Sequence, residues 1–208
     1  MKLTKKIFEN KKTIISGIQA SGKTFLAKEL LKNFKAVVFT LNKDDVKNYF
    51  ITKKNLLIID DKDIIKNFEY WLKKCKEWSE ENKIDCIFID DADVFFKNHM
   101  DTNATLRDIW SNHRHYKLTL FLVSHRLQDI PARLYGQVEN FILFTIESPH
   151  TKDLLNKFYP NLGNVVCSLP FKSYKFVLKI IGQPPKILKY SIKRKSNKTL
   201  KGGMKNNE

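Results

Sequence analysis

Short β-prone runs of apolar residues recur along the chain, and most of them are continuous rather than alternating with polar residues. They lie at 13–16, 36–40, 55–59, 86–89, 118–123 and 141–144. Continuous apolar runs of this length are typical of strands that are buried on both faces. The pattern therefore predicts an α/β protein with a mainly parallel sheet flanked by helices.

Helical periodicity separates several of these runs. Residues 25–31 are helix-like, and the stretch 63–82 predicts a long amphipathic helix, because its apolar residues are spaced three and four apart: Ile64, Ile65, Phe68, Trp71, Leu72, Cys75 and Trp78. Beyond about residue 160 the pattern changes to short β-like pieces around 174–178 and 187–188, which indicate edge strands or a hairpin. We expect one domain over residues 1–190, with a core of about 12–158, and a basic tail over 191–208.

A complete phosphate-binding motif follows the first run. The sequence G-x-x-x-x-G-K-T occupies Gly17, Ile18, Gln19, Ala20, Ser21, Gly22, Lys23 and Thr24, with Phe25 opening the helix that follows. A strand, a glycine-rich turn and a helix N-terminus together form a P-loop, whose backbone N–H groups surround an anion. We expect Lys23 to reach the β- and γ-phosphates of ATP and the Thr24 hydroxyl to bind Mg²⁺.

Hydrolysis also requires an acidic pair at the end of a buried strand, and two candidates exist. Asp60–Asp61 and Asp90–Asp91 each follow four apolar residues. The second pair precedes a strand that ends in polar residues, and we therefore assign Asp90 to Mg²⁺, through water, and Asp91 to the role of general base or water-orienting group. An aspartate at 60 or 61 is alternatively a cap for the predicted helix.

Polar residues at the end of the fifth run supply the other candidate groups. Ser124 and His125 follow the strand, and we expect His125 to sense the γ-phosphate or the attacking water. Four of the five arginines fall in one short window, although lysine is the usual cation of this chain: Arg107, Arg114, Arg126 and Arg133. A planar guanidinium suits bidentate contact with phosphate, which lysine cannot imitate.

The charge of the chain favours a polyanionic partner. Its 208 residues include 38 Lys and Arg against 22 Asp and Glu, a formal charge of +16. Part of the excess lies in the tail, for which a solubilising role is the alternative interpretation. The three cysteines have the spacing of neither a disulfide framework nor a zinc site. Because no secretory or membrane-spanning segment is recognisable, we expect a cytoplasmic protein.

Taken together, these motifs resemble those of the FtsK/HerA superfamily of DNA-pumping ATPases, and within it the small genome-packaging ATPases of icosahedral, membrane-containing viruses of archaea and bacteria. The resemblance covers roughly residues 12–158 and comprises Gly17–Thr24, Ile89–Ala92, Asn112–His115, Val123–Arg126 and Asp129–Pro131. His125 stands where relatives commonly have glutamine, and Asp91 stands where many have glutamate.

The resemblance implies an additive-strand, RecA-like P-loop NTPase that works in a homo-oligomeric ring, with a hexamer favoured. ATP would bind between subunits, and Arg114 would complete the neighbour's site, with Arg126 or Arg133 as alternatives. Double-stranded DNA would pass through the centre and be held by its phosphates independently of sequence. A capsid or vertex protein would be a further partner, and the location would be the host cytoplasm or the virion.

Three other functions fit parts of the sequence. A phage morphogenesis ATPase of the zonula-occludens-toxin type shares a similar core but works at a membrane. A small-molecule or nucleotide kinase also fits a short chain with an early P-loop. A DNA-binding protein with a degenerate nucleotide site is disfavoured, because Lys23, Thr24 and Asp90 are intact.

Overall fold

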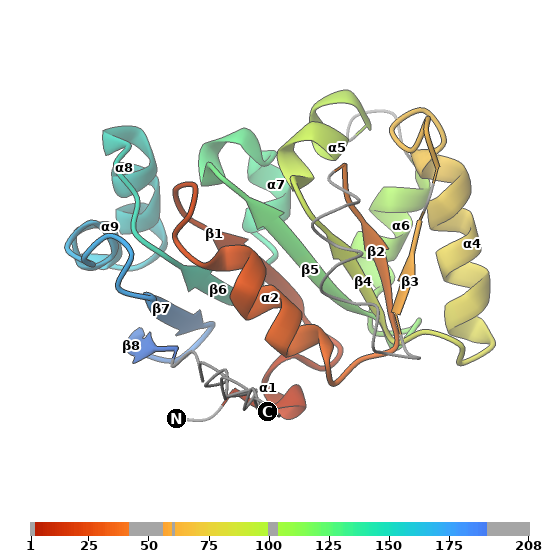
Figure 1. The fold of residues 1–208 in the computed structure, drawn as a ribbon, viewed down its shortest axis with the longest axis horizontal. Coiled ribbons are helices and arrows are strands. Elements are labelled where there is room, and N and C mark those ends of the chain that lie inside the picture. The colour runs from red at the N-terminus through yellow and green to blue at the C-terminus, as the bar shows by residue number, and fades with distance from the viewer. Residues whose placement is uncertain (1–2, 42–55, 60, 100–103, 191–208) are drawn as a thin grey trace, which may run out of the picture.

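The computed structural model describes residues 3–41, 56–59, 61–99 and 104–190. Figure 1 shows a twisted sheet of eight strands in the order β3-β2-β4-β5-β1-β6-β7-β8. The strands are β1 (Lys12–Ser16), β2 (Ala36–Phe39), β3 (Leu56–Ile58), β4 (Cys86–Ile89), β5 (Thr119–Ser124), β6 (Asn140–Leu143), β7 (Lys175–Ile180) and β8 (Lys186–Lys189). The six predicted runs are therefore all strands, with bounds that differ by one or two residues.

Strand β5 lies between β1 and β4, and all strands from β1 to β6 are parallel. The register pairs Ser16 at the end of β1 with Ser124 at the end of β5, and Ile89 at the end of β4 with Leu122. Parallel strands place their carboxyl ends at one edge of the sheet. This additive-strand arrangement confirms the predicted fold and brings the P-loop, the second acidic pair and His125 to that edge.

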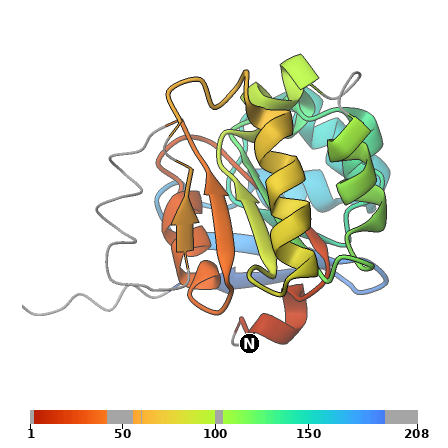
Figure 2. The same ribbon diagram turned by 90° about the vertical axis from the view of Figure 1, so that its right-hand side faces the viewer.

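Helices cover both faces of the sheet. Helices α1 (Lys5–Phe8) and α2 (Lys23–Leu31) contribute Phe8, Leu26 and Leu30 to a core cluster on one face. The opposite face is covered by α4 (Phe68–Glu80), α5 (Ala92–His99), α6 (Ala104–Asn112), the 3₁₀ helix η1 (Leu127–Asp129), α7 (Ala132–Tyr135), α8 (Pro149–Phe158) and α9 (Leu162–Cys167). Figure 2 shows α2 and α4 on opposite sides of the strands.

The predicted helix over 63–82 is shorter than expected, because α4 begins only at Phe68 and ends at Glu80. Residues 62–67 form turns instead. The carboxylate of Asp61 accepts hydrogen bonds from the backbone N–H of Asp63 and from the side chains of Asn67 and Trp71, at 2.8–2.9 Å. Such side-chain acceptors compete with helical hydrogen bonding and hold the backbone in turns. Asp61 thus stabilises the turns that precede α4, in keeping with the alternative interpretation that this pair serves the start of the helix. Asp60 lies outside the described residues.

The last two strands form an antiparallel hairpin that extends the sheet beyond β6. This agrees with the β-rich piece predicted after residue 160. The expected basic tail over 191–208 lies outside the described residues, and the division into one domain and a tail stays a prediction. In the described part of the chain, every helix is too short or too polar to cross a lipid bilayer.

Candidate active site

The P-loop lies between the end of β1 and the start of α2, and it is packed tightly against the residues that directly follow β6. A Cβ on Gly17 would come within 2.6 Å of the Phe144 Cβ, so a side chain at this position would displace the loop. Gly22 has φ +106°, a conformation that residues with a side chain rarely adopt. The Ile18 N–H donates to the Thr145 carbonyl oxygen at 3.0 Å, which fixes the start of the loop to the segment that follows β6.

Lys23 lies at the centre of this loop and is buried. Its Nζ donates to the carbonyl oxygens of Gly17 and Ile18 at 2.6 and 2.8 Å. Burial lowers the pKa of Lys23 to about 8, although nearby Asp90, Asp91 and Asp93 oppose the shift. The ammonium group is therefore held among backbone oxygens and three carboxylates, where a phosphate would be a further anionic partner.

Asp90 and Asp91 directly follow β4 at the same edge of the sheet. The Asp90 N–H continues the sheet by donating to the Phe39 carbonyl oxygen at 2.9 Å, and Asp91 has φ +49°. Burial, followed by the like charge of Asp91, raises the pKa of Asp90 to about 6. A nearby cation stabilises the charged form of a half-buried carboxylate whose pKa is raised. This is the property expected of a group that holds Mg²⁺.

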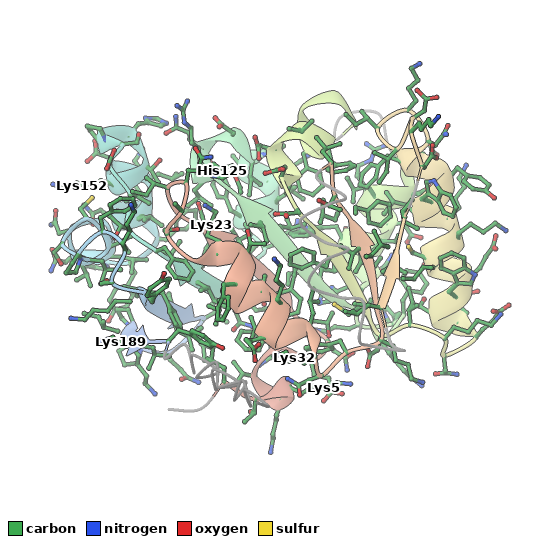
Figure 3. The ribbon with its side chains drawn as sticks, viewed as in Figure 1. Lys5, Lys23, Lys32, His125, Lys152 and Lys189 are labelled. Atoms are coloured by element: carbon green, nitrogen blue, oxygen red, sulfur yellow. The ribbon has the colours of Figure 1, made fainter. Side chains whose placement is uncertain are left out.

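His125 joins the P-loop to the acidic pair. Its Nδ1 lies 3.2 Å from the Lys23 Nζ, and its Nε2 lies 3.4 Å from an oxygen of Asp91. Figure 3 shows Lys23 and His125 close together above the start of α2. Ser124 is buried, and its hydroxyl donates to the Arg126 carbonyl oxygen while accepting the Arg126 N–H. Ser124 thus closes the turn that presents His125 at the site.

The residues of this edge suit a nucleoside triphosphate with Mg²⁺. The Ser21 Oγ is buried and has no hydrogen-bond partner among the described residues, which leaves a polar group for an anion in the loop. No three His, Cys, Asp or Glu residues of the described ranges could hold a metal ion by themselves. Thr24 and Asp90 would therefore need phosphate oxygens to complete a Mg²⁺ shell. A cleft of about 320 Å³ covers the site and is lined by Gln19–Phe25, Asp90, Asp91, Val123 and His125.

A family of ATPases matches the part of the chain that builds this edge. The match is to the ATPase family associated with various cellular activities, AAA, over residues 13–146. The chain belongs to the AAA family. The matched residues include the whole P-loop, the acidic pair and His125, and the expected ATPase activity, with ATP as the nucleotide, is thereby confirmed.

Solved structures with the same fold as this AAA domain include viral and bacterial ATPases. The genome-packaging NTPase B204 of Sulfolobus turreted icosahedral virus 2, in complex with ATPγS, has a TM-score of 0.71 at 19% identity, covering 88% of this chain and 98% of its own. The cytoplasmic domain of the type VII secretion ATPase EccC of Thermomonospora curvata has a TM-score of 0.65 at 14% identity, covering 86% of this chain and 25% of its own. The pCW3 conjugation coupling protein TcpA, with ATPγS, has a TM-score of 0.59 at 13% identity, covering 88% and 60%.

The fold of B204 agrees with the resemblance to genome-packaging ATPases that the motifs indicate. At 19% identity the likeness concerns the fold, and it extends over nearly the whole of both chains. None of the curated protein sequences matches this AAA-family chain.

Of the candidate arginines of the AAA domain, Arg126 lines a cleft with the P-loop residue Ile18 and with His125, whereas Arg114 lies far from this loop. Arg114 lies at the amino edge of the sheet, where its exposed guanidinium donates to Glu139 at 2.7 Å. Glu139 is buried beside the first residue of β1 and accepts the Lys12 N–H at 2.8 Å. Arg126 is exposed next to His125, and Arg133 is exposed on α7. Of these residues, Arg126 lies closest along the chain to the site of its own subunit.

Two supports of the site were missed by reasoning from the sequence. Asp93, on the first turn of α5, adds a third carboxylate to the surroundings of Lys23. Its position two residues after the acidic pair is the signal that could have found it. Phe144 and Thr145, which directly follow β6, hold the start of the P-loop. No local pattern reveals that contact, because it joins segments that are more than 120 residues apart.

Proposed function

We propose that this ATPase translocates double-stranded DNA as a subunit of a homo-oligomeric ring that packages a viral genome, with a hexamer favoured. The observation that carries the ATPase part is the contact of His125 with both Lys23 and Asp91, at 3.2 and 3.4 Å. The DNA part is supported by the charge and by the basic hairpin described below. The proposal includes docking on a capsid or vertex protein, in the host cytoplasm or on the virion.

Each residue of the site has a role in this proposal. The backbone N–H groups of the P-loop and Lys23 hold the phosphates, and Thr24 and Asp90 hold Mg²⁺, which when bound neutralises charge on the β- and γ-phosphates. Asp91 accepts the proton of the attacking water. His125 contacts both Lys23 and Asp91, and it therefore lies where it can detect the terminal phosphate and orient that water.

The β7–β8 hairpin is a candidate contact surface for DNA phosphates. Residues 154–207 contain no Asp or Glu, whereas the hairpin and its approach carry lysines at 172, 175, 179, 186 and 189. Lys175 and Lys189 are exposed and lie directly opposite one another in the antiparallel register. Like charges in such a pair repel each other, and a bound phosphate relieves the repulsion. Lys189 is labelled on this hairpin in Figure 3.

Sharing of sites between subunits is proposed for Arg114. Its guanidinium is at the opposite edge of the sheet from the P-loop of its own subunit, and its side chain is 68% exposed. From there it reaches phosphates only on another subunit. Glu139 fixes one nitrogen of the guanidinium and leaves the rest of the planar fork for a phosphate. Arg126 and Arg133 are the alternatives.

The deciding experiment measures ATP hydrolysis with and without double-stranded DNA, together with particle size with and without nucleotide. We expect DNA to stimulate hydrolysis and nucleotide to favour the ring. A monomer that phosphorylates a small molecule without responding to DNA would establish the kinase instead. DNA-independent hydrolysis with membrane association would favour the phage morphogenesis ATPase.

The hairpin has its own test in the salt dependence of DNA binding. Each phosphate neutralised contributes about −0.9 to the slope of log affinity against log salt concentration. Replacing Lys175 and Lys189 together by glutamine should therefore reduce the steepness by about 1.8. The matched control replaces Lys66 and Lys73, which are exposed on or beside α4 but paired with Asp63 and Glu69. Equal slopes in both double variants would exclude the hairpin as the contact surface.

A further inference from the structure

Two aromatic side chains that flank the β7–β8 hairpin, Tyr174 before β7 and Tyr190 after β8, lie against the P-loop and the start of α2. A Cβ on Gly22 would come within 3.0 Å of the Tyr174 Cδ1, so the Tyr174 ring borders the loop. The Tyr190 ring packs edge-on against Phe25, with centroids 5.0 Å apart and an interplanar angle of 71°. The Tyr190 N–H donates to the Tyr174 carbonyl oxygen at 3.0 Å. One backbone contact thus holds both rings beside the nucleotide-binding motif.

These rings lie on the side of the P-loop where a nucleoside would leave it. His125 and Asp91 follow β5 and β4, which lie on one side of β1, whereas β6, β7 and β8 lie on the other side. A terminal phosphate that faces His125 directs the rest of the phosphate chain away from β5, along the first N–H groups of α2. The sugar and base then emerge beyond Phe25, toward the hairpin.

Tyr174 differs from the other aromatic residues in this region. Phe144 and Phe176 are buried, whereas Tyr174 remains 38% exposed. Its backbone has φ +54°, which is unusual for a bulky side chain. An aromatic ring with an open face can stack on a nucleobase, and such stacking is tolerant of the identity of the base because every base has a π-face.

We propose that Tyr174 stacks on the base of the bound nucleoside triphosphate, while the Phe25–Tyr190 pair borders the sugar. This inference rests on the nucleotide site proposed above and extends it to the nucleoside. Because stacking does not read the edge of the base, the site accepts adenine and guanine with affinities that differ by only a few-fold. The hairpin then contributes to nucleotide binding as well as to the sheet.

The test compares two ligands that share the phosphates but not the base. The dissociation constants of Mg²⁺-ATP and Mg²⁺-tripolyphosphate are measured for the wild type, Tyr174→Ala and Tyr174→Phe. We expect Tyr174→Ala to lose about 10-fold in affinity for ATP and nothing for tripolyphosphate. Tyr174→Phe should bind both as the wild type does. Tyr70→Ala is the control, because Tyr70 is exposed on α4 at 55%.

The possible results separate a failure of the proposed base stacking from a failure of the nucleotide site. Equal losses for ATP and tripolyphosphate would mean that Tyr174 supports the loop rather than the base, and no loss for either would mean that the base lies elsewhere. Both results overturn the inference while leaving the ATPase intact. A wild type that binds neither ligand would instead overturn the nucleotide site. If the alanine variant unfolds, Tyr174→Leu keeps an apolar side chain against Gly22 and removes only the π-face.

Discussion

Replacing Asp91 by asparagine should move both limbs of the pH profile of nucleotide binding in the same direction. Binding with Mg²⁺ requires Asp90 deprotonated and Lys23 protonated, and their pKa values are about 6 and about 8. Affinity is therefore highest between these values and falls on either side. The Asp91 charge raises the pKa of Asp90 as a like charge and that of Lys23 as an opposite charge. Asparagine removes the charge and keeps the shape, so both pKa values fall.

The size of the shift follows from Coulomb's law. Two charges about 5–7 Å apart interact by about 1.2–1.7 kcal/mol at an effective dielectric constant of about 40, which corresponds to about one pH unit. The Asp91 side chain is 32% exposed, so salt and solvent reduce this value. We expect the acid limb to move from about 6 toward 5 and the basic limb from about 8 toward 7.

The assay is the affinity of a fluorescent ATP analogue at saturating Mg²⁺, measured from about pH 5 to about pH 9.5. Binding is the readout because Asp91 is also the proposed base, whose loss removes turnover. The nucleotide itself titrates in the same way with every variant. The difference between the pH profiles of the variants therefore reports only on groups of the protein. Asp153→Asn, at an exposed position of α8, is the control. Limbs that stay in place or move apart would refute the assignment of these two groups.

Three further predictions concern Lys23 of the P-loop, the proposed shared Arg114, and the packing of α9 against α8 at Gly163. Lys23→Ala should lose at least about 100-fold in ATP turnover without a change in circular dichroism, and unchanged turnover would remove the proposed site. Arg114→Ala should lose activity that mixing with Lys23→Ala subunits partly restores, whereas the exposed Arg107→Ala should stay active; a mixture without recovery would argue against shared sites. Gly163→Ala should destabilise the fold by about 2–4 kcal/mol in urea unfolding, because its Cβ would collide with the Lys152 carbonyl oxygen, and a loss below about 0.5 kcal/mol would contradict this packing.

The features that sequence predicted well depend on short segments. The strands were predicted because burial on both faces demands continuous apolar residues, and the P-loop because its glycines and lysine are adjacent in sequence. The start of α4 was misplaced because the side chain of Asp61 holds the following residues in turns. The spacing of apolar residues cannot predict where side-chain acceptors compete with backbone acceptors for the same N–H groups.

Contacts between distant segments were beyond reach from sequence. The pairing of Arg114 with Glu139 joins residues 25 positions apart, and the approach of Tyr174 to Gly22 joins residues far more distant in the chain. Both depend on strand order and register, which short patterns do not encode. The choice of Asp90–Asp91 over the other pair rested on the polar end of the fifth strand, which is a tertiary argument, and the structure places this pair beside His125. Its catalytic role stays a prediction.

The exposed edge of β8 affects whether molecules of this protein aggregate at high concentration. Within the described ranges nothing pairs with the outer side of β8, and an open strand of this kind is a template for runaway polymerisation. Lys186 and Lys189 mark its two ends, and both are exposed. If the β8 strands of two molecules approached each other, their lysines would repel, and this repulsion opposes aggregation through the sheet edge. Substituting them with neutral residues would lower the solubility of the protein.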